Sequence, residues 1–220
     1  MLDSGYLGDL GGLGSHRAFA RLDLRGTGAS GEPADPASYR CDRQVTDVEA
    51  VRRHLGHDRI ALLGHSAGAN LAYAYAAAHP GRVERLLLVT PSVRGLGIDI
   101  PDRARSEMAR LRVGEPWYAD AAAALARVQA GVGEEADWSA ISPFTHGRWD
   151  ADTRAYEAWM DERRDEAKAA AFVAEGALDP DATRTALVAL DAPVLVLAGA
   201  VDVGNPPAAM AEVAAVFPHG

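Results

Sequence analysis

The apolar positions of the first ninety residues alternate between short continuous runs and helical spacing. Continuous apolar runs at 60–63 and 86–89 predict buried strands, and the short, partly apolar run at 18–24 predicts a third. The segments 42–55 and 70–79 carry the spacing of helices. Because strands that are apolar throughout and separated by single helices are typical of parallel sheets, we expect βαβ units and an α/β fold.

The helix at 42–55 has recognisable ends in the sequence. Val45, Val48 and Val51 fall on one face of it, with charged residues opposite. Asp42 is the residue type that caps a helix N-terminus, and Gly56 is the type that follows a C-terminus. We therefore predict Asp42 as the N-cap and Gly56 as the stop.

The pattern changes after Ser92, and no strand pattern follows until the apolar run at 193–198. Helical stretches are predicted near residues 103–112, 119–130, 151–174 and 181–190, and a last helix is predicted over 207–217. We therefore expect a mostly parallel sheet with flanking helices, built from residues 1–91 and 191–220. A helical cap insertion over 92–190 interrupts it.

Composition and charge narrow the function. The chain has 220 residues, of which 48% are hydrophobic and 24% charged, as in ordinary globular proteins. A net charge of −9 excludes a protein that follows nucleic-acid phosphates. The single cysteine, Cys41, cannot form an internal disulfide. The opening residues resemble no signal peptide, and no apolar run approaches the roughly 20 residues of a membrane span. We expect a cytoplasmic protein without nucleic-acid or membrane partners.

One motif carries chemistry. Residues 64–68 read Gly-His-Ser-Ala-Gly, a G-x-S-x-G pattern between a predicted strand and a predicted helix. In that context the serine sits on a sharp turn, the nucleophile elbow, and glycines two residues to either side prevent clashes. Ser66 is the candidate nucleophile, and the N–H of Ala67 is a candidate donor to an oxyanion. The alternative is a glycine-rich turn whose serine only caps the helix. His65 is expected to pack or orient.

Further segments make the chain resemble the α/β-hydrolase superfamily, most closely its proline iminopeptidase-like branch and related esterases. Asp23 to Ser30 resembles the D-x-R-G-x-G-x-S turn of that family. Three more stretches resemble the helix before the elbow, the end of the helix after it and the next strand: Asp47–Gly56, His79–Val83 and Leu86–Val89. The resemblance implies a serine hydrolase that needs no cofactor or metal and acts on a small molecule or short peptide.

The resemblance also implies an acid and a base. Asp202, after the run at 193–198, matches the family's acid position; the alternative is a loop aspartate that caps a turn. The base should be a histidine after one more helix and strand. His219 is the one histidine after Asp202, but it directly follows the last predicted helix, so it is a weak candidate. His146 would break the family's order of triad residues.

No H-G-G-type oxyanion loop precedes the first matching segment, so the chain resembles the middle of such an enzyme. Two interpretations follow. One is a serine hydrolase that cleaves an N-terminal peptide bond or a small ester. The other is a truncated or degenerate non-catalytic remnant of the same fold. In either case we expect little turnover and an exposed sheet edge or apolar surface.

The predicted cap offers two further sets of side chains. Its tryptophans could line a pocket over Ser66 or pack the cap against the sheet: Trp117, Trp138, Trp149 and Trp159. Its carboxylates could hold a substrate ammonium, as in aminopeptidase relatives, or form a solvated helix face: Glu157, Asp161, Glu162, Asp165 and Glu166.

Overall fold

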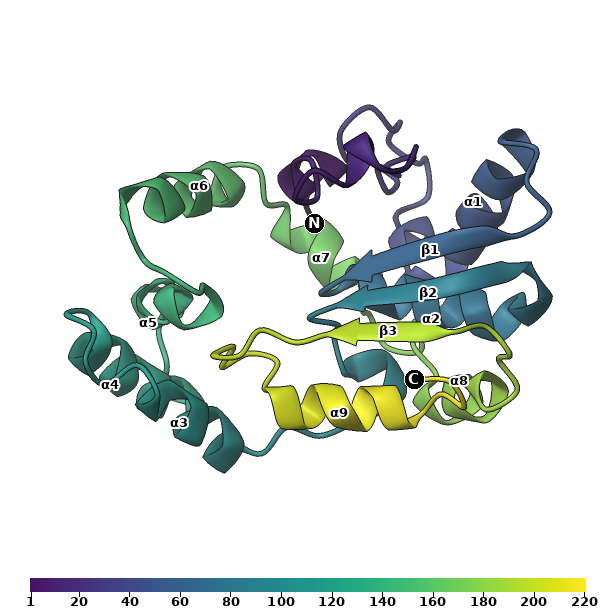
Figure 1. The fold of residues 1–220 in the computed structure, drawn as a ribbon. Helices are drawn as coiled ribbons and strands as arrows, with labels where there is room; N and C mark the ends of the chain where they lie inside the picture. The colour runs from purple at the N-terminus through teal and green to yellow at the C-terminus, as the bar shows by residue number, and fades with distance from the viewer.

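Three parallel strands form one sheet in the computed structural model, which describes residues 1–220 (Figure 1). The strands are β1 (Ile60–His65), β2 (Val83–Val89) and β3 (Val194–Leu197), in the order β1-β2-β3. Leu63 pairs with Leu87, and Leu87 pairs with Leu195. The predicted α/β fold with a parallel sheet is confirmed.

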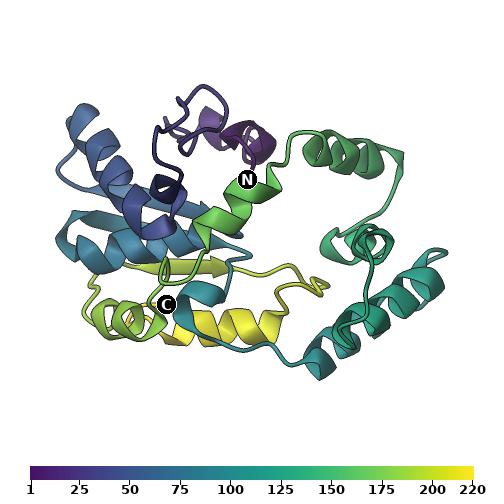
Figure 2. The same cartoon turned by 180° about the vertical axis from the view of Figure 1, so that it is seen from behind.

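Four helices pack against the sheet, two of them behind the strands and two along the lower edge in Figure 1, and Figure 2 shows them from the other side. They are α1 (Cys41–His54), α2 (Gly68–Ala78), α8 (Pro180–Leu187) and α9 (Pro207–Ala215). The larger hydrophobic cluster lies between them and the sheet. Leu86 and Leu88 of β2 are fully buried there, together with Tyr73 and Tyr75 of α2. This face of the sheet is therefore a complete core.

The chain runs away from the sheet after β2 and back to it through five further helices (Figure 1). They are α3 (Asp102–Arg110), α4 (Tyr118–Gln129), α5 (Glu135–Ala140), α6 (Ala151–Asp161) and α7 (Glu166–Phe172). A second, smaller cluster joins α3 and α4 around Phe144, and Val203 reaches it from beyond β3. Phe172 and Leu187, by contrast, belong to the main cluster. The division at residues 91 and 191 stays a prediction.

The helical predictions need two corrections. The stretch 151–174 is two helices. The first ends at Asp161, and Asp165 caps the second by accepting from the N–H of Lys168. The short helix α5 was not predicted. Its start is set by a capping box in which Glu134 and Asp137 each accept from the other's backbone. Both features depend on local capping rather than on apolar periodicity.

The strand predicted at 18–24 is wrong, because these residues form no strand and β1 pairs only with β2. Leu22 and Leu24 instead pack their side chains against the main cluster. A strand requires a partner ladder for its N–H and C=O groups, and nothing pairs with this segment. The apolar pattern correctly predicted that these side chains pack against the core, but it could not predict whether the segment pairs with another strand.

The turn after this segment is held by side chains of the resemblance motif. Asp23 accepts from the N–H of Ser4 at 2.8 Å and from that of Ala29 at 3.0 Å. Gly28 has φ +51°, and a Cβ there would collide with the Asp23 carboxylate. Arg25 donates to both oxygens of Asp47 on α1, each at 2.7 Å. The motif therefore fixes the N-terminal segment against α1.

The predicted ends of α1 fare differently. Asp42 as N-cap is wrong: the helix begins at Cys41 after Arg40, and no side chain caps it. Asp42 lies in the first turn, where it is favourable to the helix dipole, and pairs with Arg40 at 3.0 Å. Gly56 as the stop is confirmed, because it follows the C-cap Leu55 with φ +72°.

A buried ion pair within α1 is hydrogen-bonded to α2. Glu49 is 8% exposed and Arg52 is 6% exposed. Arg52 donates to both Glu49 oxygens at 2.7 and 2.8 Å, and the Tyr75 hydroxyl donates to the same carboxylate at 3.0 Å. These hydrogen bonds, led by the guanidinium of Arg52, hold the pKa of Glu49 well below its usual range.

We predict that this pair makes stability acid-sensitive. Because the folded pKa of Glu49 lies below the unfolded value, its contribution is complete above the unfolded pKa of about 4.3 and is lost as pH falls below it. Urea unfolding from pH 7 to pH 3 should show Glu49→Gln as less stable at pH 7 and less acid-sensitive. Glu212→Gln, at an exposed residue in no ion pair, is the control. An unchanged acid slope in Glu49→Gln would contradict the prediction.

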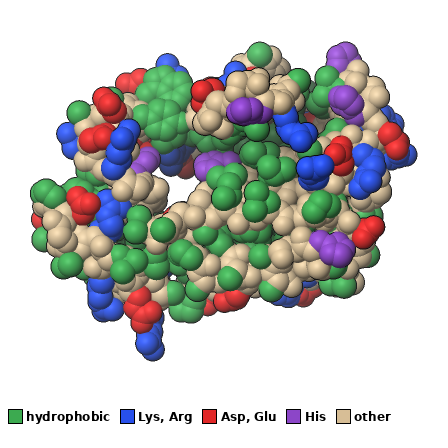
Figure 3. All heavy atoms as spheres, viewed as in Figure 1, with side chains coloured by type: hydrophobic (Ala, Val, Ile, Leu, Met, Phe, Trp, Pro, Cys, Tyr) green, Lys and Arg blue, Asp and Glu red, His purple; other side chains and the backbone are tan.

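The opposite face of the sheet carries no helix (Figures 1 and 2). Leu195 is 52% exposed and Leu197 is 51% exposed. The register places them beside Leu87 and Val89 on this face, and Leu63 is the next residue across. Hydrophobic side chains are visible over the sheet in Figure 3. Since parallel sheets are normally covered on both faces, this bare face is the exposed apolar surface that the sequence predicts.

We predict that the bare face makes the chain self-associate. Leu195→Thr with Leu197→Thr keeps strand propensity and removes most of the apolar area. Burying a leucine fully is worth about 1.5–3 kcal/mol, so the onset of association should move to at least about tenfold higher concentration. Light scattering over a concentration series measures this. Leu111→Thr with Val113→Thr, at exposed positions beyond the end of α3, should change nothing. Equal effects of both pairs would refute the assignment.

Candidate active site

The backbone of Ser66 is strained at the end of β1. Its φ is +48°, a left-handed conformation that costs free energy in any residue with a Cβ. Its N–H donates to the carbonyl of Val89 at 3.1 Å, and its carbonyl accepts from the N–H of Ser92 at 2.9 Å. These two bonds anchor the turn to the end of β2. The sharp strand-to-helix turn predicted around Ser66 is confirmed.

The two glycines of the motif occupy different surroundings, and only one of them is required by packing. A Cβ on Gly64 would lie 2.8 Å from the Cα of Ala69 and 3.0 Å from the Cβ of Ala72, so only glycine lets β1 lie against α2. A Cβ on Gly68 would have nothing within 4 Å. The expectation that Gly68 also prevents a clash is wrong in this chain, because the turn points that position into open space.

Helix α2 begins directly behind Ser66. Ala67 is its N-cap residue, and the Ala67 N–H makes no hydrogen bond within the chain. The Ser66 hydroxyl forms no hydrogen bond to the first N–H groups of α2, so it does not act as a helix cap. A free N–H at a helix N-terminus favours negative charge beside it.

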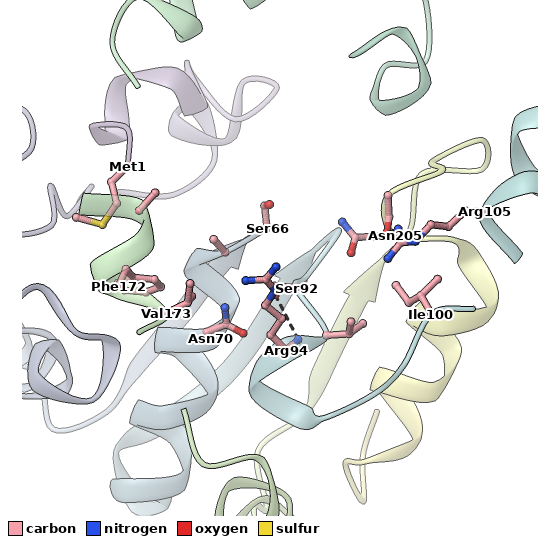
Figure 4. A pocket seen from close by; sticks show the side chains of 14 residues that line it. Met1, Ser66, Asn70, Ser92, Arg94, Ile100, Arg105, Phe172, Val173 and Asn205 are labelled. Carbon is pink, nitrogen blue, oxygen red and sulfur yellow. Dashed lines mark hydrogen bonds between the residues drawn. The ribbon is translucent and has the colours of Figure 1, made fainter. Parts of the chain in front are cut away.

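Ser66 and Ala67 line a pocket of about 390 Å³ (Figure 4). Gly204 and Asn205, from the turn that carries Asp202, form its opposite side. Its apolar wall consists of side chains from three segments and includes Val93, Ile100, Ala169, Phe172 and Val173. The pocket therefore joins the carboxyl ends of β1, β2 and β3 to the returning helix α7.

The polar lining residues that were not singled out from the sequence include Asn70, Arg94 and Arg105. Asn70 lies in the first turn of α2, two residues after the motif. The arginines lie in the segment after β2 and in α3. Their signal was hidden, because a chain with 22 basic residues offers many arginines of equal appearance.

Asp202 occupies the turn after β3, at the same edge of the sheet as Ser66, with β2 between their strands. Its carboxylate accepts from the N–H of Asn205 at 2.9 Å. Burial raises the pKa of Asp202, and the backbone N–H groups of Asn205 and Gly204, followed by the charge of Arg105, oppose that rise. The turn thus presents a partly desolvated carboxylate that a cationic partner would stabilise.

His65 lies on the bare face of the sheet, in register with Val89. Its Nδ1 is 2.8 Å from the hydroxyl of Tyr6. Burial lowers the pKa of His65, while Asp202 opposes the shift, so the imidazole is neutral at pH 7. Burial also raises the pKa of Tyr6 to about 12, which keeps its hydroxyl protonated. His65 packs against Tyr6, as the sequence predicts.

The other candidate histidines lie away from the pocket. The carbonyl of His219 accepts from the N–H of Val194 at the start of β3, the end opposite to Asp202, and its ring is 3.4 Å from Asp191. The ring of His146 is bonded to Glu157 at 2.9 Å. No histidine lines the pocket with Ser66.

The predicted cap side chains also stay out of this pocket. None of the four tryptophans lines it: Trp117 packs edge-on against Phe144 in the smaller cluster, and Trp159 stacks on Tyr156. None of the candidate carboxylates lines it either. Asp165 caps α7 and Asp161 pairs with Arg164, so these two serve the helices that carry them.

The fold and this strand-turn-helix site match a known family. The profile of the alpha/beta hydrolase fold matches residues 12–220, so the chain belongs to that family. Among curated relatives, it is 38% identical over 99 residues to the N-formylmaleamate deformylase of Pseudomonas putida. The aligned region covers 45% of this chain and 33% of the relative. The first curated relatives are matched over 21% to 33% of their own length.

Two solved structures illustrate the shared fold. A proline iminopeptidase from Mycobacterium smegmatis superposes with a TM-score of 0.66 at 23% identity, over 98% of this chain and 75% of that one. A thermophilic esterase from Thermogutta terrifontis gives a TM-score of 0.65 at 22% identity, over 99% and 75%. The expected likeness to iminopeptidases and esterases is thereby confirmed at the level of fold. None of the helices is long and apolar enough to cross a membrane.

We predict that the two motif glycines respond oppositely to alanine. Gly64→Ala forces β1 away from α2 and should lower the free energy of unfolding by about 1–3 kcal/mol, the usual cost of overpacking. Gly68→Ala, in open space at the start of a helix, should cost nothing and could add up to about 1 kcal/mol. Urea unfolding of both variants checks this. Equal destabilisation would contradict the packing argument.

Proposed function

We propose that the chain carries the nucleophile and acid of a serine hydrolase, with Ser66 as nucleophile, Asp202 as acid and the Ala67 N–H as oxyanion donor. The observation that supports this most is the left-handed Ser66, held between β2 and α2 at the edge of a pocket. Backbone strain of this kind persists where the surrounding structure imposes it, and it clusters at functional sites.

In the proposed reaction, the Ser66 oxygen attacks a carbonyl carbon and its proton passes to a base. In this family the base is an imidazole, and no histidine among the pocket's lining residues supplies it. The carbonyl oxygen becomes an oxyanion that accepts from the Ala67 N–H. Asp202 orients the imidazole and stabilises its charged form. The leaving alcohol or amine takes the proton, and water then hydrolyses the acyl-enzyme by the same route. The relatives are named for an esterase, an iminopeptidase and a deformylase, so both esters and amides are candidates.

The second candidate is a non-catalytic domain of the same fold. It is favoured by one observation, that no histidine lines the pocket with Ser66. Without a cooperating base, turnover falls by roughly 10⁴ to 10⁶. We therefore expect the 220-residue chain to turn over p-nitrophenyl acetate slowly. Rapid turnover that disappears in Ser66→Ala would exclude the non-catalytic interpretation.

A fluorophosphonate probe tests the nucleophile itself. On prolonged incubation it should label the folded chain on Ser66, more slowly than a hydrolase with its base in place, because the turn presents the hydroxyl to the pocket beside the Ala67 N–H. Peptide mass spectrometry should locate the adduct, and Ser66→Ala should abolish it. Ser139→Ala, at an exposed serine of α5 without a hydrogen bond, is the matched control and should label fully. Absence of labelling in folded wild-type protein would refute the proposal.

A further inference from the structure

The pocket beside Ser66 has the opposite charge to the protein. The chain has a net charge of −9, with 31 acidic and 22 basic residues. Yet two arginines, Arg94 and Arg105, line the pocket, and no aspartate or glutamate does. A concave site lined by one sign of charge concentrates the field and attracts ligands of the other sign.

The two guanidinium groups are not neutralised by a carboxylate. Arg94 forms neither an ion pair nor a side-chain hydrogen bond within the chain, and Figure 4 shows it extending toward Ser66. Arg105 donates to the carbonyls of Val203 and, at 2.6 Å, Gly204, which hold it at the opposite side of the pocket. Its charge also opposes the raised pKa of Asp202, but no salt bridge joins the two. Both cations remain available to a ligand.

Asn70 supplies independent evidence for a missing partner. It is 1% exposed, and its Oδ1 accepts from the N–H of Gly95 at 2.9 Å. Because this bond assigns the oxygen, the other amide atom is the nitrogen, and Nδ2 is buried without any acceptor. It points toward the pocket below Arg94 in Figure 4. A buried donor left unpaired costs about 1–3 kcal/mol, which a ligand acceptor would recover.

We propose that this pocket binds substrates that carry a carboxylate group, with Arg94 and the Asn70 amide as its donors and Arg105 adding charge. This inference rests on the proposed hydrolase function and specifies its substrate class. The planar guanidinium of arginine matches a carboxylate with two parallel hydrogen bonds. The apolar wall around Val93, Ile100 and Phe172 accommodates the carbon chain between the carboxylate and the scissile bond.

The same residues argue against a cationic substrate. A peptide with a free N-terminal ammonium would need carboxylates in the pocket, and the cap carboxylates lie elsewhere. Arg94 and Arg105 would repel that ammonium. Of the substrates that the sequence leaves open, the pocket therefore selects anionic esters or amides and rejects N-terminal peptides.

Three methyl esters of similar size separate these possibilities: monomethyl succinate is anionic, dimethyl succinate is neutral, and β-alanine methyl ester is cationic. Binding to the full-length Ser66→Ala chain, which cannot acylate, is measured by titration with NMR detection. Monomethyl succinate should bind at least about tenfold more tightly than the other two, as expected for hydrogen bonds to a charged group. Its affinity should weaken with added salt.

Variants locate the effect. Arg94→Gln should weaken binding of monomethyl succinate about tenfold, and Arg94→Lys should restore part of it. Asn70→Asp keeps the acceptor for Gly95 but replaces the donor by a carboxylate, so it should also weaken binding. Arg17→Gln makes the same charge change at an exposed residue in no ion pair and should have no effect. If Asn70→Asp fails to fold, the Arg94 variants decide the question.

Equal affinity for the three esters, preference for the cationic ester, no binding of any, or an effect of Arg17→Gln equal to that of Arg94→Gln would overturn the inference. These results are separate from fluorophosphonate labelling of wild-type protein. Labelling without anion preference refutes only the substrate class, whereas anion binding without labelling refutes only the hydrolase proposal.

Discussion

The left-handed turn at Ser66 is the constraint on which the rest of the site depends. Its cost is met by the Val89 and Ser92 backbone bonds on one side and by the close approach of Gly64 to Ala69 on the other. That approach sets where α2 begins, and so where the Ala67 N–H and the Asn70 amide point. The order β1-β2-β3 then brings the turn after β3, with Asp202, to the same edge of the sheet. The strained residue is thus bonded directly to the end of β2, to Ser92 and to the first turn of α2.

The arginines of this protein differ in whether a carboxylate within the chain neutralises them. On α1, Arg52 and Glu49 satisfy each other inside the fold, and Tyr75 completes the pair, so this charge serves stability. In the pocket, the guanidinium of Arg94 has no partner within the chain, and that of Arg105 has only carbonyl oxygens. Groups that are paired within the chain are explained by folding. Groups that remain unpaired beside a strained serine call for a ligand.

The two faces of the sheet differ in how far their leucines are exposed to solvent. Leu86 and Leu88 are buried under α2 and its neighbours, while Leu195 and Leu197 are half exposed on the other face. Both sets come from strands that read as apolar throughout, as expected for a parallel sheet covered on both sides. The bare face also carries His65, which is hydrogen-bonded to Tyr6, so the exposed leucines lie close to the candidate site.

The sequence by itself determined the parallel sheet, the family and the position of the strained turn at Ser66, because periodicity and a glycine-spaced serine are local signals. It also located Gly56 as a helix stop. It could not decide whether residues 18–24 pair as a strand, since pairing depends on a neighbour distant in the chain. Only the tertiary structure showed that Gly68 faces open space and that His219 lies at the wrong end of β3 to meet Asp202. It alone singled out Arg94, because an arginine becomes informative only when the groups around it are known.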